Sequence, residues 1–173
     1  MWTNQGCILT TKDFTILEIL QERRGGLGEP MMALLRHKLD SATVVFRDDV
    51  PADVATLNSR VRFRIGETAP ETRIISHDQM QGMVGLTLPL TTLRGLALLG
   101  LAGGESIVLP RDGENAPHRI ILETVLYQPE AARQRNAEHA RRRPPLRLVH
   151  DAGALVTTIG AETGDDDPGP SAA

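Results

Sequence analysis

The sequence predicts an α+β fold, with a short N-terminal antiparallel helical hairpin followed by an antiparallel sheet that carries one short helix. Residues 8–45 contain two stretches with apolar positions at helical spacing, separated by a glycine-rich turn, which is typical of such a hairpin. Residues 51–128 contain short runs of β-type residues divided by turn residues, which favours strands. Residues 129–173 change to a basic and then an acidic composition, and we expect them to form a partly disordered tail.

Local signals mark the ends of both helices in the hairpin. Thr10 or Thr11 can cap the first helix, and Asp13 places a negative charge in its first turn, where the helix dipole favours one. Glycines end this helix, and Pro30 suits the first turn of the second. An apolar side chain such as Leu27 at an exposed hairpin tip contributes little to stability, so it suggests contact with a partner. The residues expected at the tip are Arg23, Arg24, Leu27 and Glu29.

The clearest strand is Arg60–Ile65, which has one apolar face and one cationic face. The cationic face either contacts nucleic acid or an acidic protein surface, or is a solvated face paired with acids on a neighbouring strand. Its members are Arg60, Arg62 and Arg64. A short helix is expected over residues 93–100. Four further strands are expected at Thr72–His77, Gly85–Leu88, Glu105–Leu109 and Arg119–Leu126.

The tail begins with a second charged pattern. Glu130–Arg143 contains five arginines and two glutamates, which predicts a basic helix ended by Pro144. Its last arginines, 141–143, are either a polybasic contact or an ordinary charged helix end. Asp165–Ala173 is acidic and rich in proline and glycine, which predicts disorder.

The composition argues against several functions. A formal net charge of -3 is not typical of a chain that binds nucleic acid as a whole. The single cysteine, Cys7, excludes an internal disulfide and fits a reducing cytosol. The histidines are far apart and no P-loop motif occurs, so we expect no metal and no cofactor. No signal peptide is apparent and no apolar segment approaches the ~20 residues that cross a bilayer, so we expect a cytoplasmic protein that does not contact membranes.

Three motifs resemble one protein family. The segment PADVATLNSRVRFR, Pro51–Arg64, is similar to the start of the C-terminal domain in Rnk proteins, the regulators of nucleoside diphosphate kinase. The segment LALLGL, Leu96–Leu101, and the following Gly104 match a second motif of the same domain, and Tyr127–Ala131 matches its end. Rnk proteins are relatives of the transcript-cleavage factors GreA and GreB, and the similarity covers about residues 8–131.

The resemblance implies an FKBP-like fold for residues 51–128 and a docking site on the rim of the secondary channel of RNA polymerase, against its largest subunit. The surface that the resemblance assigns to this contact lies around the start of the short helix. It comprises Thr92, Leu93, Arg94, Gly95 and Leu96, with Thr92-Leu93 where the family has Ser-Pro.

The hairpin tip decides the expected activity. Gre factors carry two acidic residues at the tip of a long coiled coil, and these help to bind the magnesium that activates water. The stretch Arg23–Glu29 offers one acid beside two arginines on a short hairpin, so we expect a regulator without transcript cleavage. The alternatives are an adaptor for another partner, such as nucleoside diphosphate kinase, and a peptidyl-prolyl isomerase. An aromatic content of 3% disfavours the isomerase.

Overall fold

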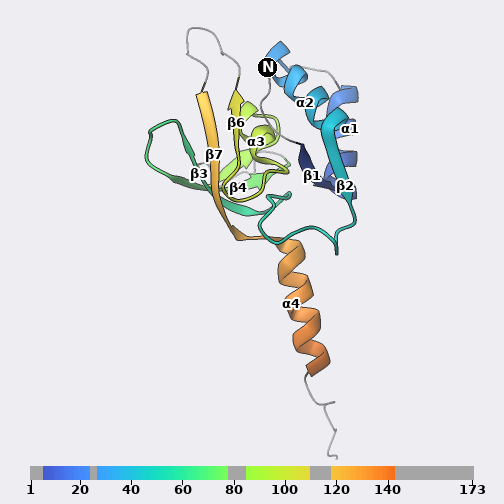
Figure 1. Ribbon diagram of the computed structural model, residues 1–173. Helices are drawn as coiled ribbons and strands as arrows, with labels where there is room; N and C mark the ends of the chain where they lie inside the picture. Colours follow the sequence, from blue (N-terminus) through green and yellow to red (C-terminus); the bar gives the residue numbers. More distant parts are fainter. Residues whose placement is uncertain (1–5, 24–26, 78–84, 110–117, 143–173) are drawn as a thin grey trace, which may run out of the picture. The chain divides into compact units, whose positions relative to one another are not determined.

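The computed structural model describes residues 6–23, 27–77, 85–109 and 118–142 (Figure 1). The expected disorder at Asp165–Ala173 and the arginine at 143 therefore lie outside the described residues. Residues 1–142 belong to one compact unit and residues 143–173 to a second. In chain order the elements are β1 (Cys7–Thr10), α1 (Thr11–Arg23), α2 (Glu29–Ser41), β2 (Ala42–Val45), β3 (Arg60–Ile65), β4 (Glu71–Ser76), β5 (Thr87–Pro89), α3 (Leu93–Leu98), β6 (Ser106–Leu109), β7 (His118–Tyr127) and α4 (Pro129–Arg142).

The main sheet has five strands in the order β5-β4-β3-β7-β6. Strand β3 pairs antiparallel with β4 and β7, and β6 pairs antiparallel with β7. Strand β5, however, runs parallel to β4, so the expectation of a purely antiparallel sheet is wrong at this edge. Residues 77–86 separate the two strands, which is more than a tight hairpin turn contains. Parallel neighbours need such a longer connection, whereas a two-residue turn would make them antiparallel.

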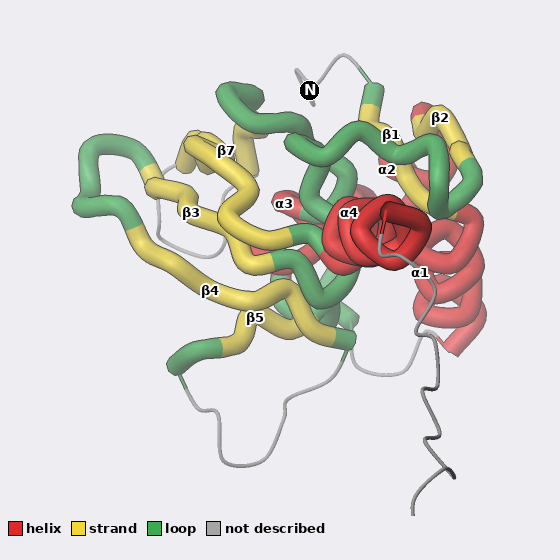
Figure 2. Tube along the Cα trace, turned by 90° about the horizontal axis from the view of Figure 1, so that it is seen from below, coloured by secondary structure: helices red, strands yellow, loops and turns green. Residues whose placement is uncertain are grey.

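The sheet is curled because the pairing of β3 with β7 is irregular at two points. The register shifts between Arg60 and Val61 and again between Arg62 and Phe63. Such bulges bend a strand and increase its twist. Figure 2 shows the resulting curved sheet, with α3 between it and α2, in agreement with the contacts that α3 makes with both. The α+β class predicted from the sequence is confirmed.

The core lies between the sheet and α3. Val61 and Phe63, on the predicted apolar face of β3, are buried together with Leu122 of β7. Leu96 and Leu98 of α3 pack into the same cluster. Burying each such side chain contributes about 1.5–3 kcal/mol, so this face supplies much of the driving force for folding. The alternation in Arg60–Ile65 thus identified the inward side of the sheet correctly.

A second, two-stranded sheet was not expected. Strands β1 and β2 pair in parallel. Strand β1 leads directly into α1, and β2 directly follows α2, in a region that the sequence pattern assigns to helices alone. Four-residue strands are too short to show a clear alternation beside a helical pattern. The backbone N–H of Ile8 in β1 also donates to the carbonyl of Gly100, at 3.0 Å, which fastens this small sheet to the end of α3.

Gly100 permits this close approach. Its φ is +80°, and a Cβ at this position would lie 2.9 Å from Leu9 Cδ2 and 3.0 Å from the carbonyl oxygen of Ile8. Both the positive φ and the lack of space favour glycine. This glycine belongs to the LALLGL motif, so part of that motif serves to attach the N-terminal elements to the rest of the unit.

Candidate partner-binding surfaces

The segment Thr92–Leu96 forms the capped start of α3. The Thr92 hydroxyl donates to the carbonyl oxygen of Pro89 at 2.7 Å and accepts the backbone N–H of Gly95 at 3.1 Å, which makes Thr92 the N-cap. Leu93 is half-buried against the core, and Gly95 and Leu96 are buried. Arg94 is exposed. Of the five residues predicted to meet a partner here, Arg94 is therefore the exposed one, Thr92 and Leu93 are half-buried, and Gly95 and Leu96 are buried.

The arginine face of β3 is partly neutralised by its neighbour β7. Arg62 Nε lies 3.1 Å from Glu123 Oε2, and Arg64 Nε lies 3.6 Å from Glu123 Oε1. For these two residues the geometry matches the alternative of a solvated face paired with an acid. Arg60 is exposed and forms no ion pair with any residue that the structure describes.

The predicted hairpin tip lies between the end of α1 and the start of α2. Arg23 and Glu29 are exposed at these two helix ends, whereas Arg24 lies outside the described residues. Leu27 is half-buried against the core, so it is not the exposed apolar tip that the sequence suggested. The predicted set also left out Glu22, which is exposed one residue before Arg23, so each helix end carries an acid. In the described part of the chain, no group of three or more acids, histidines or cysteines could hold a metal ion.

The structure brings together a buried polar contact that sequence reasoning missed. Lys38 of α2 is 1% exposed, and its Nζ donates to the carbonyl oxygen of Leu99 at 2.5 Å, just after α3. Burial lowers the pKa of the Lys38 ammonium group. The Cys7 thiol lies 3.7 Å from the carbonyl oxygen of Lys38, and burial raises the pKa of Cys7. The burial of Lys38 could have been predicted from its position in the helix. It lies seven residues after Met31 and four after Leu34, on the buried face of α2.

Replacing Lys38 with methionine is expected to preserve the fold and to change the pH dependence of stability. Methionine has a similar length, so it leaves little empty space, whereas alanine would open a cavity and cost about 2–5 kcal/mol. The folded pKa of Lys38 lies below the ordinary 10.5, so the unfolded chain binds this proton more tightly and wild-type stability rises as the pH approaches 10.5. The free energy of unfolding of the wild type relative to Lys38→Met should therefore increase between about pH 7 and about pH 10 in urea titrations.

The matched control is Lys12→Met, because Lys12 is exposed on α1. This variant should follow the wild type at both pH values. A difference between the wild type and Lys38→Met that stays constant with pH would show that the Lys38 proton is not linked to folding.

A second buried polar group lies in the first turn of α1. Asp13 is 2% exposed, and its backbone N–H donates to the Thr10 hydroxyl at 3.1 Å. Desolvation raises the pKa of Asp13 to about 6, and the nearby Glu130 of α4 contributes in the same direction. Glu130 Oε2 accepts a hydrogen bond from the Thr56 hydroxyl at 2.7 Å. The sequence identified Asp13 as a helix-start residue but gave no sign of its burial.

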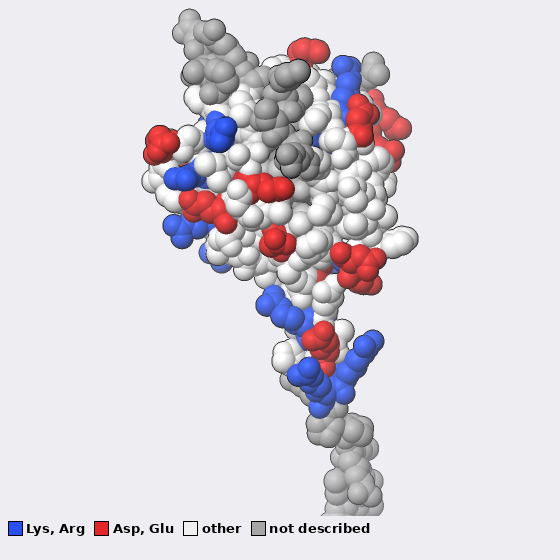
Figure 3. Space-filling view, in the orientation of Figure 1, with Lys and Arg blue, Asp and Glu red and all other residues white. Residues whose placement is uncertain are grey.

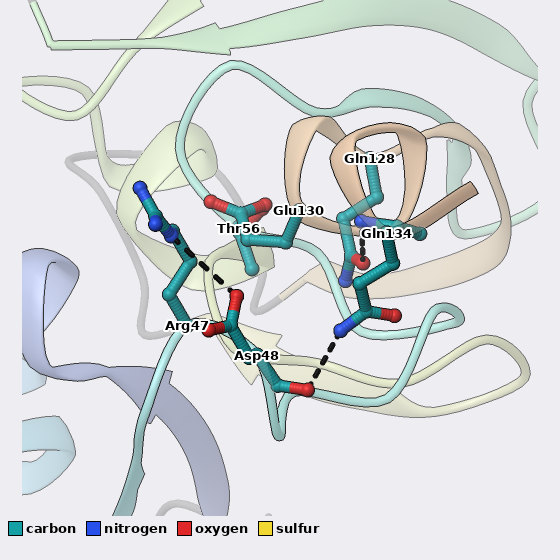
Figure 4. Close-up of polar contacts among 7 residues, drawn as sticks. Arg47, Asp48, Thr56, Gln128, Glu130 and Gln134 are labelled. Atoms are coloured by element: carbon teal, nitrogen blue, oxygen red, sulfur yellow. Dashed lines mark hydrogen bonds and ion pairs between the residues drawn. The ribbon is translucent and has the colours of Figure 1, made fainter. Parts of the chain in front are cut away.

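Helix α4 is attached to the unit by hydrogen bonds at its base (Figure 4). Gln128 Nε2 donates to the carbonyl oxygens of Pro51 and Val54, each at 2.7 Å. Gln134 Nε2 donates to the carbonyl oxygen of Asp48 at 2.6 Å. None of the helix's own residues is buried. The predicted basic helix at Glu130–Arg143 thus forms over Pro129–Arg142, and the segment 48–56 holds it by polar contacts.

The sequence has a clear curated relative. Over 126 residues the chain is 34% identical to the regulator of nucleoside diphosphate kinase of Escherichia coli K12, and the match covers 72% of this chain and 92% of that protein. This chain belongs to the family of regulators of nucleoside diphosphate kinase, the Rnk family. The Shigella flexneri protein of the same name matches to the same extent. None of the models of known protein families matches the sequence.

The fold agrees with this Rnk assignment. A prokaryotic transcription elongation factor GreA/GreB from Nitrosomonas europaea superposes with a TM-score of 0.55 and 30% identity, covering 72% of this chain and all of that structure. The family resemblance inferred from Pro51–Arg64 and the two later motifs is thus confirmed, and the α+β fold is similar to that of a GreA/GreB-type factor. Among the residues that the structure describes, no helix is long and apolar enough to cross a bilayer.

Proposed function

We propose that this Rnk-family protein is a non-enzymatic, cytoplasmic transcription regulator that binds RNA polymerase at the rim of the secondary channel. The observation that carries the proposal is the match to a GreA/GreB-type elongation factor, which this chain covers over its whole length. Under this proposal the curled sheet with α3 is the FKBP-like docking module, and α1 with α2 is a short antiparallel arm. The alternative partner, nucleoside diphosphate kinase, comes from the name of the relatives.

The start of α3 suits a docking surface. Thr92 holds this turn through two hydrogen bonds, so the backbone around Arg94 is ordered before a partner arrives. A contact that is already ordered loses less conformational entropy on binding. Arg94 adds an exposed cation at the same point, which suits an acidic partner surface.

The dimensions of the helical pair argue against transcript cleavage. Helices α1 and α2 have 13 residues each, which gives roughly 20 Å at ~1.5 Å per residue. Their apolar faces are already used, since Leu17 of α1 and Leu34 and Leu35 of α2 are fully buried in the core. An arm packed against its own unit in this way has limited reach into a deep channel. Glu22 and Glu29 make a direct cleavage assay necessary, because two carboxylates flank the turn.

The test is a binding assay with the purified full chain and bacterial RNA polymerase. We expect Arg94→Glu to weaken binding about tenfold, or about 1.4 kcal/mol, because it places a like charge against an acidic surface. Arg36→Glu, which makes the same charge change on the exposed side of α2, is the control and should bind like the wild type.

Two results would contradict the proposal. Binding of nucleoside diphosphate kinase without binding of the polymerase would support the adaptor alternative instead. Stimulated RNA cleavage in backtracked transcription complexes would overturn the non-enzymatic part, and we expect no cleavage above the level of polymerase alone.

A further inference from the structure

A groove between α4 and the end of β7 has no role in the function proposed above. It encloses about 340 Å³ and is lined on one side by Val125, Leu126 and Tyr127 of β7 and on the other by side chains of α4. Leu126 is 52% exposed and Tyr127 is 47% exposed, although both are large side chains on a strand of the main sheet. Large apolar side chains exposed together beside a groove are typical of a binding surface.

The helix that forms the other wall is held in position by hydrogen bonds at its N-terminal end. The hydrogen bonds of Gln128, Glu130 and Gln134 to the segment 48–56 fix its base, and none of its residues is buried. The groove therefore exists before a partner binds. A partner would bury apolar surface against β7 without a large loss of conformational entropy in α4.

The charges of α4 favour an acidic occupant. Arg135 lines the groove, and Arg142 lies seven residues further on, which places both on the same side of the helix, roughly 10 Å apart along its axis. Neither forms an ion pair with a residue that the structure describes. Figure 3 shows basic side chains around α4 with an acidic one among them, and over the whole helix four arginines stand against two glutamates, one of which, Glu138, also lines the groove.

We propose that this groove binds an acidic segment of a partner protein, which inserts an apolar side chain between β7 and α4 and places carboxylates opposite Arg135 and Arg142. Ala52, Val125 and Leu126 offer an apolar floor that suits an aliphatic or aromatic side chain. A nucleic acid fits less well, because the groove contains a single aromatic ring, Tyr127, on which a base could stack. This proposal does not depend on binding to RNA polymerase.

The test begins with a random peptide display library, selected on the full-length protein. Selected peptides are then synthesised with a fluorescent label, and their affinity is measured by polarisation. We expect enrichment of peptides with Asp or Glu on both sides of a large apolar residue. Arg135→Glu with Arg142→Glu should weaken their binding at least about tenfold, and Leu126→Ser should weaken it as well, because it removes the apolar floor.

The matched control is Arg133→Glu with Arg36→Glu. It changes the net charge equally, but Arg133 points away from the groove side of α4 at 3.6 residues per turn, and Arg36 lies on α2. Binding should be unchanged within about twofold. Circular dichroism verifies that all variants are folded.

Three results would overturn the proposal. The first is a selection that enriches no acidic, apolar peptides. The second is equal loss of binding in the groove variant and in its control, which would indicate a general charge effect. The third is tight binding of a single-stranded oligothymidine that depends on Arg135 and Arg142 while the peptides do not, which would identify the site as a nucleic-acid contact.

Discussion

Replacing Gly95 with alanine is expected to destabilise the protein by about 3 kcal/mol, near the upper end of the effect of overpacking a core. Gly95 lies in the first turn of α3, where the helix contacts the end of β5. A Cβ there would overlap the carbonyl oxygen of Pro89, and it would lie 2.8 Å from the carbonyl carbon of Pro89 and 3.1 Å from the carbonyl oxygen of Leu88. These are backbone atoms, so no side-chain rotation relieves the overlap and α3 must move away from β5.

The sign of the effect makes this prediction specific. At an open helical position, alanine in place of glycine stabilises a protein by up to about 1 kcal/mol, whereas here it should do the opposite. Gly103→Ala is the control, because the nearest atom to a Cβ at that position lies at an ordinary 3.7 Å. Urea unfolding at constant pH measures both variants. Equal stabilities for the two would mean that α3 can shift freely relative to β5.

Gly95 is buried within the proposed docking segment. Comparing Gly95→Ala with Arg94→Glu therefore distinguishes a displaced segment from the loss of a direct contact with the partner. A displaced α3 moves Arg94 and disrupts the hydrogen bonds of Thr92, so Gly95→Ala should weaken polymerase binding under conditions where the protein is still folded. Arg94→Glu, in contrast, should weaken binding with little effect on stability, since exposed substitutions usually change stability by less than about 0.5 kcal/mol.

Replacing Asp13 with asparagine is expected to stabilise the protein increasingly as the pH rises. The folded pKa of about 6 lies above the ordinary value of 3.8, so the folded chain holds this proton more tightly than the unfolded chain does. The contribution of Asp13 to stability is therefore highest below about pH 4 and declines as the pH rises through 6. A pKa difference of about 2 corresponds to about 3 kcal/mol at neutral pH. Asparagine carries no charge and avoids this loss.

Several groups near Asp13 contribute to the shift of its pKa. Burial dominates, Glu130 of α4 adds to the rise in the pKa, and the Thr10 hydroxyl, the backbone N–H of Leu57 and Lys12 oppose it. Asparagine loses part of those favourable contacts. We therefore expect the advantage of Asp13→Asn over the wild type to increase by about 2–3 kcal/mol between about pH 4 and about pH 8.

Glu18→Gln is the matched control, since Glu18 is exposed on the same helix. Its stability relative to the wild type should change little over this pH range. An advantage of Asp13→Asn that does not grow with pH would show that the carboxyl is already well solvated in the folded protein.

The amino-acid sequence was sufficient for features that arise from local patterns. The alternation in Arg60–Ile65 predicted β3 and its buried side, and similar patterns located the other strands of the main sheet to within about two residues. The arginine-rich stretch predicted α4. The motifs Pro51–Arg64 and Leu96–Leu101 pointed to the Rnk family, which the comparison with curated relatives confirmed.

The candidate contact surfaces were less predictable, because exposure depends on neighbours that are distant in sequence. Glu123, on the adjacent strand β7, pairs with Arg62 and Arg64 of β3 and partly neutralises their charge. Leu27 is partly buried because it packs against the core. The groove beside α4 could not be anticipated, since it joins the end of β7, α4 and Ala52.

Taken alone, the sequence determined the family, the α+β class and the positions of the main strands, because these depend on side-chain periodicity and on short motifs. Tertiary structure decided the parallel pairing of β5 and the small sheet of β1 and β2. It also decided the burial of Lys38 and Asp13. The physical reason is that burial and pairing depend on which segments meet in space. Lys38 loses its solvent because α2 packs against α3, and the carbonyl oxygen of Leu99, sixty-one residues away, replaces part of the lost hydration.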